Sequence, residues 1–217
     1  MDESEQNQSD IQELLFEYEQ LRKEILQNDT LVLQIMGGTA VLVTAILGVV
    51  FTETVQQTAG KGFLAYVATI VTLLGLSQVI DKHHDTFRTA SYIRAFDESK
   101  LKLVRWETRL LRLRVLSARD ERFGFTSAYQ LATYAVLAIF TYVLGTNYFM
   151  EDLQSFPKYF IAGPIVMGGI TAWILYGTWV THRRYILKHA ETFDPLWNRI
   201  KAEEAKTDTD ESTSQTV

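Results

Sequence analysis

Residues Leu31–Phe51, LVLQIMGGTAVLVTAILGVVF, contain no Asp, Glu, Lys or Arg. Three further stretches share this property, namely Gly62–Ile80, Phe125–Tyr148 and Tyr159–Thr181. At a rise of 1.5 Å per residue, a helix of about twenty residues crosses the hydrocarbon core of a bilayer, which is roughly 30 Å thick. The sequence therefore predicts an all-α, polytopic membrane protein with a four-helix transmembrane bundle and cytoplasmic amphipathic helices.

These stretches divide the 217 residues into five parts. We expect an acidic amphipathic helix in 1–30, a transmembrane hairpin in 31–80, a basic helical loop in 81–124, a second hairpin in 125–181 and a tail in 182–217. The spans are 31–51 and 62–80 in the first hairpin, and 125–148 and 159–181 in the second. From about residue 208 the tail is small, polar and acidic, a composition typical of disorder.

The distribution of basic residues predicts the topology. Of the 21 Lys and Arg residues, only Lys61 and Lys158 lie in the short links within the two hairpins. Short loops rich in Lys and Arg stay on the cytoplasmic side. We therefore expect a multi-pass protein of the plasma membrane with both the N-terminus and the C-terminus in the cytoplasm. The acidic start of the chain lacks the basic n-region of a signal peptide, so the first span should remain as an anchor.

The N-terminal part carries one apolar stripe. Its members recur at three- and four-residue spacing, as in an amphipathic helix that packs like a coiled coil: Ile11, Leu14, Leu15, Tyr18, Leu21, Ile25 and Leu26. The segment Asn28-Asp29-Thr30 offers helix-capping residues before the first span. Residues 1–30 hold nine acids against two bases. A helix on anionic lipid should be basic, so we expect a protein partner instead.

The loop between the hairpins is the nearest basic partner. Residues 81–124 hold eleven bases and seven acids. Phe87, Ala90, Ile93 and Phe96 extend the helical pattern of the second span, and a further helical run follows from Lys100. We expect an interaction surface, within one chain or between two, whose members on the N-terminal helix and on the loop are Leu14, Leu15, Tyr18, Leu21, Ile25, Trp106, Arg109, Leu110 and Arg112.

Two short motifs carry a resemblance to known sequences. One is Glu17-Tyr18-Glu19-Gln20-Leu21-Arg22-Lys23-Glu24-Ile25, and the other is Ser91-Tyr92-Ile93-Arg94-Ala95-Phe96-Asp97-Glu98 followed by Val104-Arg105-Trp106-Glu107-Thr108. Together they resemble a group of uncharacterised prokaryotic four-span membrane proteins over roughly the first half of the chain. The resemblance implies the four-span layout and a prokaryotic plasma membrane. It implies no activity.

The sequence contains little that could perform chemistry. There is no cysteine, which excludes disulfides, thiol catalysis and thiolate metal sites. His84 and His182 are candidates for a divalent cation, but no tight His/Cys ligand motif is present, and a polar rim at the membrane interface is the preferred interpretation. The spans hold no ionisable side chain other than tyrosine, which argues against a proton-driven transporter. We expect no catalytic residue, no cofactor and no bound metal.

Two features of the spans leave alternatives open. Neutral polar side chains could line a pore, although hydrogen bonding between helices is the preferred interpretation; the lining candidates are Gln34, Thr44, Gln78 and Gln130. Small residues let helices approach closely, either between subunits or within one chain. They are Gly37, Gly38, Ala40, Gly48, Gly163, Gly168, Gly169 and Ala172.

The functional hypothesis is a non-enzymatic platform for oligomerisation and docking. Its partners would be the lipid bilayer, further copies of the chain and a cytoplasmic protein of unknown identity, and not nucleic acid. The alternative is an oligomeric channel or membrane-permeabilising effector gated by the cytoplasmic layer. A membrane-embedded hydrolase or transferase using the interfacial His and Asp residues is disfavoured, because the sequence has no pattern of nucleophile and base.

Overall fold

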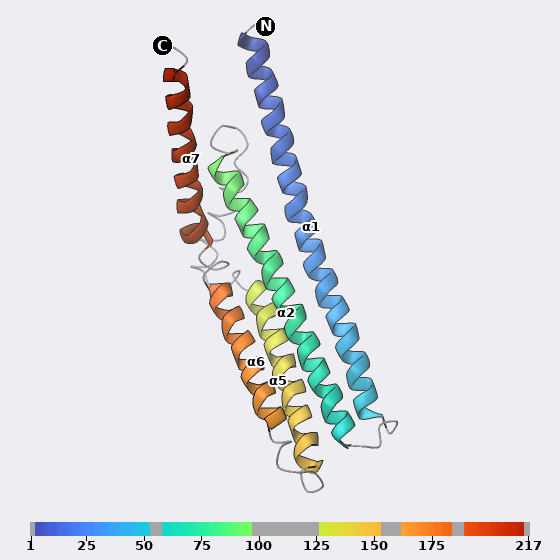
Figure 1. Ribbon diagram of the computed structural model, residues 1–217. Helices are drawn as coiled ribbons and strands as arrows, with labels where there is room; N and C mark the ends of the chain where they lie inside the picture. The colour runs from blue at the N-terminus through green and yellow to red at the C-terminus, as the bar shows by residue number, and fades with distance from the viewer. Residues whose placement is uncertain (1–2, 53–57, 97–125, 153–161, 184–188, 215–217) are drawn as a thin grey trace, which may run out of the picture. The chain divides into compact units, whose positions relative to one another are not determined.

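The structure is a computed structural model that describes residues 3–52, 58–96, 126–152, 162–183 and 189–214. Every regular element in these ranges is a helix (Figure 1). The elements are α1 (Glu3–Phe51), α2 (Thr58–Ala95), α5 (Thr126–Asp152), α6 (Ala162–Thr181) and α7 (His189–Ser214). The predicted all-α class is confirmed for the described part of the chain.

Four of these helices are long and apolar enough to cross a membrane. Their candidate spans are Ile11–Phe51 in α1, Gly60–Ala95 in α2, Tyr129–Glu151 in α5 and Ala162–Thr181 in α6. Each contains most of one charge-free stretch of the sequence. The prediction of a multi-pass membrane protein with four spans is supported at this level.

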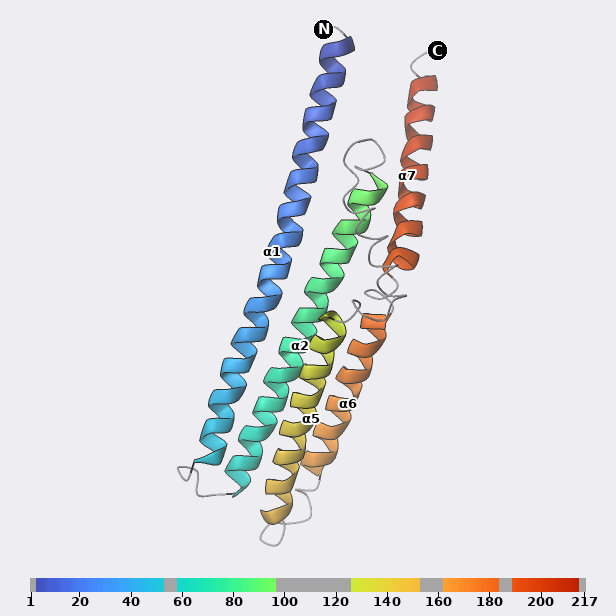
Figure 2. The same ribbon diagram turned by 180° about the vertical axis from the view of Figure 1, so that it is seen from behind.

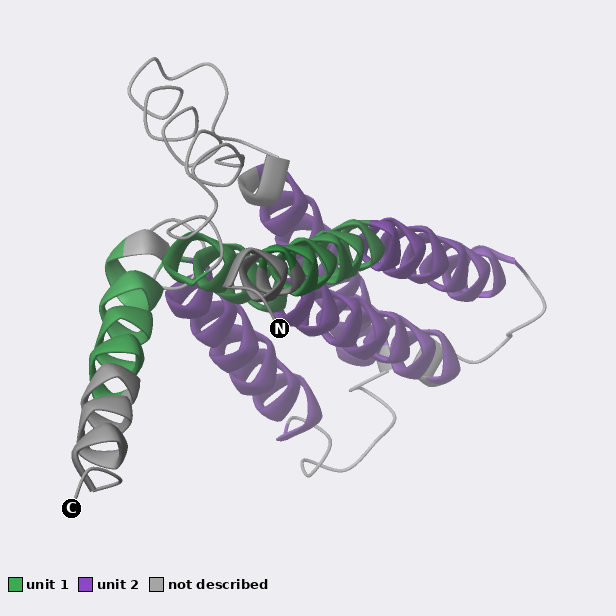
Figure 3. Ribbon diagram, turned by 90° about the horizontal axis from the view of Figure 1, so that it is seen from above, with its two compact units in different colours: residues 1–29, 83–123, 183–217 green, residues 30–82, 124–182 purple. Residues whose placement is uncertain are grey.

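The chain divides into two compact units, which Figure 3 draws in different colours. Unit 1 comprises residues 1–29, 83–123 and 183–217, and unit 2 comprises residues 30–82 and 124–182. Unit 2 therefore holds the apolar parts of α1 and α2 together with α5 and α6. Unit 1 holds the charged parts of α1 and α2 together with α7.

The capping prediction at residues 28–30 is wrong. Helix α1 continues without a break from Glu3 to Phe51, and Asn28 is buried within it. Residues 28–30 include neither proline nor glycine, so nothing interrupts the ladder of backbone hydrogen bonds.

The predicted continuation of α2 is confirmed. The helix extends from the second apolar stretch to Ala95, as the pattern of Phe87, Ala90 and Ile93 predicted.

Unit 2 places apolar side chains outside and hydroxyl groups inside. Val41, Ile165 and Trp173 are among its most exposed residues, whereas Thr69, Thr72 and Thr141 are fully buried. In lipid the solvent is itself apolar, so polar side chains are satisfied between helices. Thr69 accordingly donates a hydrogen bond to Thr141 Oγ1 across α2 and α5 at 2.9 Å.

Glycines bring the helices of unit 2 together. A Cβ atom at Gly145 of α5 would lie 2.8 Å from the Tyr66 ring and 3.2 Å from the Gly62 carbonyl oxygen of α2. Helices α5 and α6 lie side by side in Figures 1 and 2 and contact each other. There the Tyr142 hydroxyl donates to the Pro164 carbonyl oxygen at 3.1 Å. Pro164 is the third residue of α6, so it occupies the first turn, where proline is tolerated.

Helix α7 extends further than the sequence suggested. It runs from His189 to Ser214, so it includes residues 208–214, for which disorder was expected. The preceding residues 201–206, KAEEAK, are good helix formers, and helix propagation costs less than initiation once such a run is helical.

Candidate functional site

Helix α7 lies parallel to the end of α2 in unit 1, and a regular series of contacts joins them. The rings of His84 and Phe193 meet edge to face at 5.3 Å. About two turns further along α2, Ser91 Oγ accepts a hydrogen bond of 3.0 Å from Trp197 Nε1. At the end of α2, the carbonyl oxygen of Ala95 accepts one of 3.1 Å from Lys201 Nζ. Later residues of α2 contact later residues of α7, so the two helices run in the same direction along the junction.

Aromatic rings form the apolar part of this junction. The Tyr92 and Phe96 rings stack at 4.8 Å, one turn apart on α2. The Trp197 ring meets both of them edge to face, at 5.3 Å and 6.1 Å. Such offset and perpendicular arrangements are the favoured ones for aromatic pairs. Together with buried Phe193, this cluster fixes the side of α7 that faces α2.

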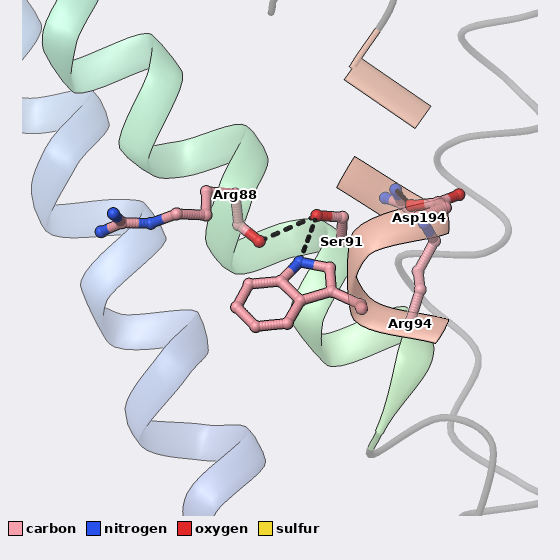
Figure 4. A network of polar contacts seen from close by, with 5 residues as sticks. Arg88, Ser91, Arg94 and Asp194 are labelled. Atoms are coloured by element: carbon pink, nitrogen blue, oxygen red, sulfur yellow. Dashed lines mark hydrogen bonds and ion pairs between the residues drawn. The ribbon is translucent and has the colours of Figure 1, made fainter. Parts of the chain in front are cut away.

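Polar contacts at the same junction are drawn in Figure 4. Ser91 Oγ accepts the hydrogen bond from Trp197 and itself donates one to the Arg88 carbonyl oxygen at 2.9 Å. Arg94 Nη2 donates to Asp194 Oδ1 at 2.7 Å. The Arg94 side chain is only 7% exposed, whereas that of Asp194 is 35% exposed. The ion pair is therefore open to solvent on the side of α7.

Helix α1 meets the other side of the α2 end. The Tyr92 hydroxyl donates to Glu17 Oε1 at 2.9 Å, and Tyr18 beside it is buried. Tyr92 therefore connects α1 to the α7 junction. Glu17 belongs to the first motif of the family resemblance and Tyr92 to the second, so two segments that the sequence singled out separately are in contact.

The predicted interaction surface is only partly within the described residues. On α1, Leu14, Leu21 and Ile25 are half-buried, Tyr18 is buried and Leu15 is exposed. The residues predicted to lie opposite them are outside the described ranges, and their pairing with α1 stays a prediction. They are Trp106, Arg109, Leu110 and Arg112.

The two histidine candidates have aromatic neighbours. His84 Nδ1 lies 3.9 Å from Asp85 Oδ1 in unit 1. In unit 2, His182 is buried with its ring stacked near that of Trp179 at 6.3 Å. Among the residues that the structure describes, no group of three or more His, Cys, Asp or Glu side chains could hold a metal ion. The metal interpretation thus gains no support from this part of the chain.

The pore-lining candidates do not meet inside unit 2. Gln34, Thr44 and Gln78 are exposed on its surface, and Gln130 is half-buried. Any pore that they line would therefore lie between chains.

The small residues divide into two groups. A Cβ atom at Gly168 would meet the Tyr142 side chain, so this glycine serves packing within the chain. A Cβ atom would meet nothing within 4 Å at the other predicted glycines, so each of them borders open space. These are Gly37, Gly38, Gly48, Gly163 and Gly169. Close packing elsewhere uses Gly62, Gly75 and Gly145.

The sequence reasoning missed α7 as a partner of α2. The signal was present, because Phe193, Trp197 and Lys201 follow one another at four-residue spacing. Leu196 and Ile200 form a second, exposed pair on the adjacent flank. The many charges of the tail obscured this short amphipathic pattern.

Comparisons with known proteins assign no family to the chain. No match was found among family models, curated proteins or solved structures. The resemblance to prokaryotic four-span proteins stays a prediction, and the functional inference depends on the geometry alone.

Proposed function

We propose that this protein is a non-enzymatic membrane platform that assembles with copies of itself and docks partners through unit 1. The observation that supports it is a set of three exposed apolar residues on one side of α1, which we call the outer flank and which consists of Ile11, Leu15 and Leu26. Their exposed fractions are 47%, 39% and 59%. With 3.6 residues per turn, these positions lie on one side of the helix.

We expect another protein surface to pack against the outer flank. Residues 11–26 also carry six charged side chains, so this segment does not lie in hydrocarbon. Ile11 and Leu15 lie one turn apart, and Arg22 separates them from Leu26 on this side of α1. Apolar side chains grouped on one side of a water-exposed helix favour an interaction site. The exposed pair Leu196 and Ile200 gives α7 a similar, smaller surface.

A second copy of the chain is the partner that best fits these features. Gly37 and Gly48 leave part of the α1 span open to close approach by another helix. Small residues of this kind promote helix association in lipid, where burial of apolar area contributes little. The acidic residues 1–30 and the basic residues 81–124 are also complementary in charge, which favours their association.

A substitution that places a charged residue on the outer flank tests the proposed assembly. We expect wild type to be oligomeric in detergent and Leu15→Asp to weaken assembly by about tenfold or more, because a leucine loses its apolar burial. The measurement is the detergent-corrected mass by light scattering over a dilution series. Gln20→Asp is the matched control, since it adds the same charge at an exposed position on the opposite side of α1. A monomeric wild type, or equal masses for all three proteins, would contradict the proposal.

A channel between copies is the second candidate, favoured by the exposed amides Gln34 and Gln78. Polar side chains that face lipid are costly, and a water-filled path between subunits would relieve that cost. Dye uptake by cells that overproduce the protein separates the two functions. The platform is expected to leave the membrane tight, whereas uptake that Gln34→Leu abolishes would favour the channel.

A further inference from the structure

The Arg94 guanidinium has more hydrogen-bond donors than the described residues satisfy. Its Nη2 group bonds Asp194 Oδ1 at 2.7 Å (Figure 4). Its Nε and Nη1 groups are buried, and no acceptor among the described residues lies within hydrogen-bond distance of them. The side chain is 7% exposed. Buried cationic donors without acceptors are strongly disfavoured, so this arrangement points to an acceptor that occupies the site.

We propose that Arg94 binds a phosphate-type oxyanion between the end of α2 and α7. The planar guanidinium presents a fork of N–H donors that matches the oxygens of phosphate. One carboxylate oxygen of Asp194 engages only part of this fork. This site is independent of the outer flank and goes beyond the proposed platform function.

A second basic side chain lies at the same end of α2. Lys201 Nζ lies 3.1 Å from the carbonyl oxygen of Ala95, the residue next to Arg94. Asp194 is about one-third exposed, so the pair is accessible from solvent.

The position of Arg94 favours a soluble phosphate over a lipid headgroup. It lies fourteen residues beyond Ile80, where the second charge-free stretch ends. At 1.5 Å per residue this is roughly 21 Å along α2, whereas the headgroup layer on each side of a bilayer is only about 5–8 Å thick. A phosphate-bearing metabolite or nucleotide has the required chemistry, and inorganic phosphate is its simplest probe.

The first test titrates inorganic phosphate into full-length protein in dodecyl maltoside, a detergent that carries no phosphate, with ionic strength held constant by chloride. Because the ligand binds the folded state, phosphate is expected to raise Tm, and the shift should grow with the logarithm of the phosphate concentration once that concentration exceeds Kd. Arg94→Gln is expected to raise the Kd fitted from these shifts by at least about tenfold, since charge-assisted hydrogen bonds are lost. The matched control is Arg88→Gln, which removes an equal charge from a half-exposed side chain on the same helix and should titrate like wild type.

A second variant separates binding from structural support. Asp194→Asn removes the competing carboxylate, so it is expected to lower the Kd for phosphate fitted from the Tm shifts, opposite in sign to Arg94→Gln. If the pair serves only to hold α7 on α2, both variants lower Tm and neither changes a phosphate response. That result would overturn the proposal, as would a wild type whose Tm responds to phosphate no more than to chloride.

A third arm identifies the source of the phosphate. The protein is compared in nanodiscs of phosphatidylcholine with and without phosphatidylglycerol. If a lipid supplies the anion, phosphatidylglycerol raises the Tm of wild type but not of Arg94→Gln, and added inorganic phosphate has no further effect. If the source is soluble, the lipid makes no difference and inorganic phosphate still raises Tm. Either result supports the site, and the absence of both overturns it.

Discussion

At the scale of single residues, steric fit decides which glycines matter. Gly145 allows α5 to approach α2 so closely that the Tyr66 ring lies against its backbone. That ring cannot move aside, because it stacks with Phe149 at 5.2 Å and with Tyr142 at 6.2 Å. Its hydroxyl also shares a hydrogen bond with Thr146 Oγ1 at 3.1 Å. Gly177, by contrast, faces open space.

We therefore predict opposite outcomes for two chemically identical substitutions. Gly145→Ala should destabilise the fold by about 1–3 kcal/mol, because the new methyl group overpacks the Tyr66 contact. Gly177→Ala should be neutral or stabilise by up to about 1 kcal/mol, because alanine has the higher helix propensity. Thermal unfolding in detergent measures both. Equal effects at the two positions would contradict the close packing of α2 and α5.

At the scale of helices, α7 is amphipathic through only three turns. Phe193 and Trp197 lie against α2, whereas Leu196 and Ile200 lie exposed on the neighbouring flank. The docking of α7 thus depends on few side chains. Tertiary contacts stabilise such a short amphipathic face more than its own helix propensity does.

Loss of the Trp197 ring should release α7 from α2. We expect Trp197→Ala to destabilise the docked state by about 2–4 kcal/mol, since it removes two ring contacts and the hydrogen bond to Ser91. Hydrogen exchange read by mass spectrometry should show faster exchange of the amides in residues 189–203, with the amides of α5 unchanged. Asn198→Ala, at an exposed position one residue later, is the control and should exchange like wild type. Unchanged protection in Trp197→Ala would contradict the docking.

At the scale of the whole molecule, the two units differ in what they bury. Unit 2 buries threonine hydroxyl groups and exposes large apolar side chains, as a lipid-facing bundle does. Unit 1 combines ion pairs and aromatic contacts, which are usual for helices in water. The distribution of Lys and Arg in the sequence predicts that unit 1 lies in the cytoplasm.

This topology is directly testable because the chain contains no native cysteine. In intact cells, a membrane-impermeant maleimide should label Thr52→Cys, which lies after the outer end of α1. Glu19→Cys should be labelled only after the membrane is permeabilised. Both positions are exposed, so accessibility in the fold does not bias the comparison. The reverse pattern would place both termini outside.

The sequence alone determined the all-helical class, the four apolar stretches and the continuation of α2 to Ala95, since these follow from local composition and from the 3.6-residue period. It did not determine that α1 runs unbroken through Asn28, which glycines are packed, or that Arg94 is buried beside Asp194. Periodicity shows that a helix has an apolar side. Only the neighbouring helices determine which residues on that side are covered and which polar groups are enclosed with them.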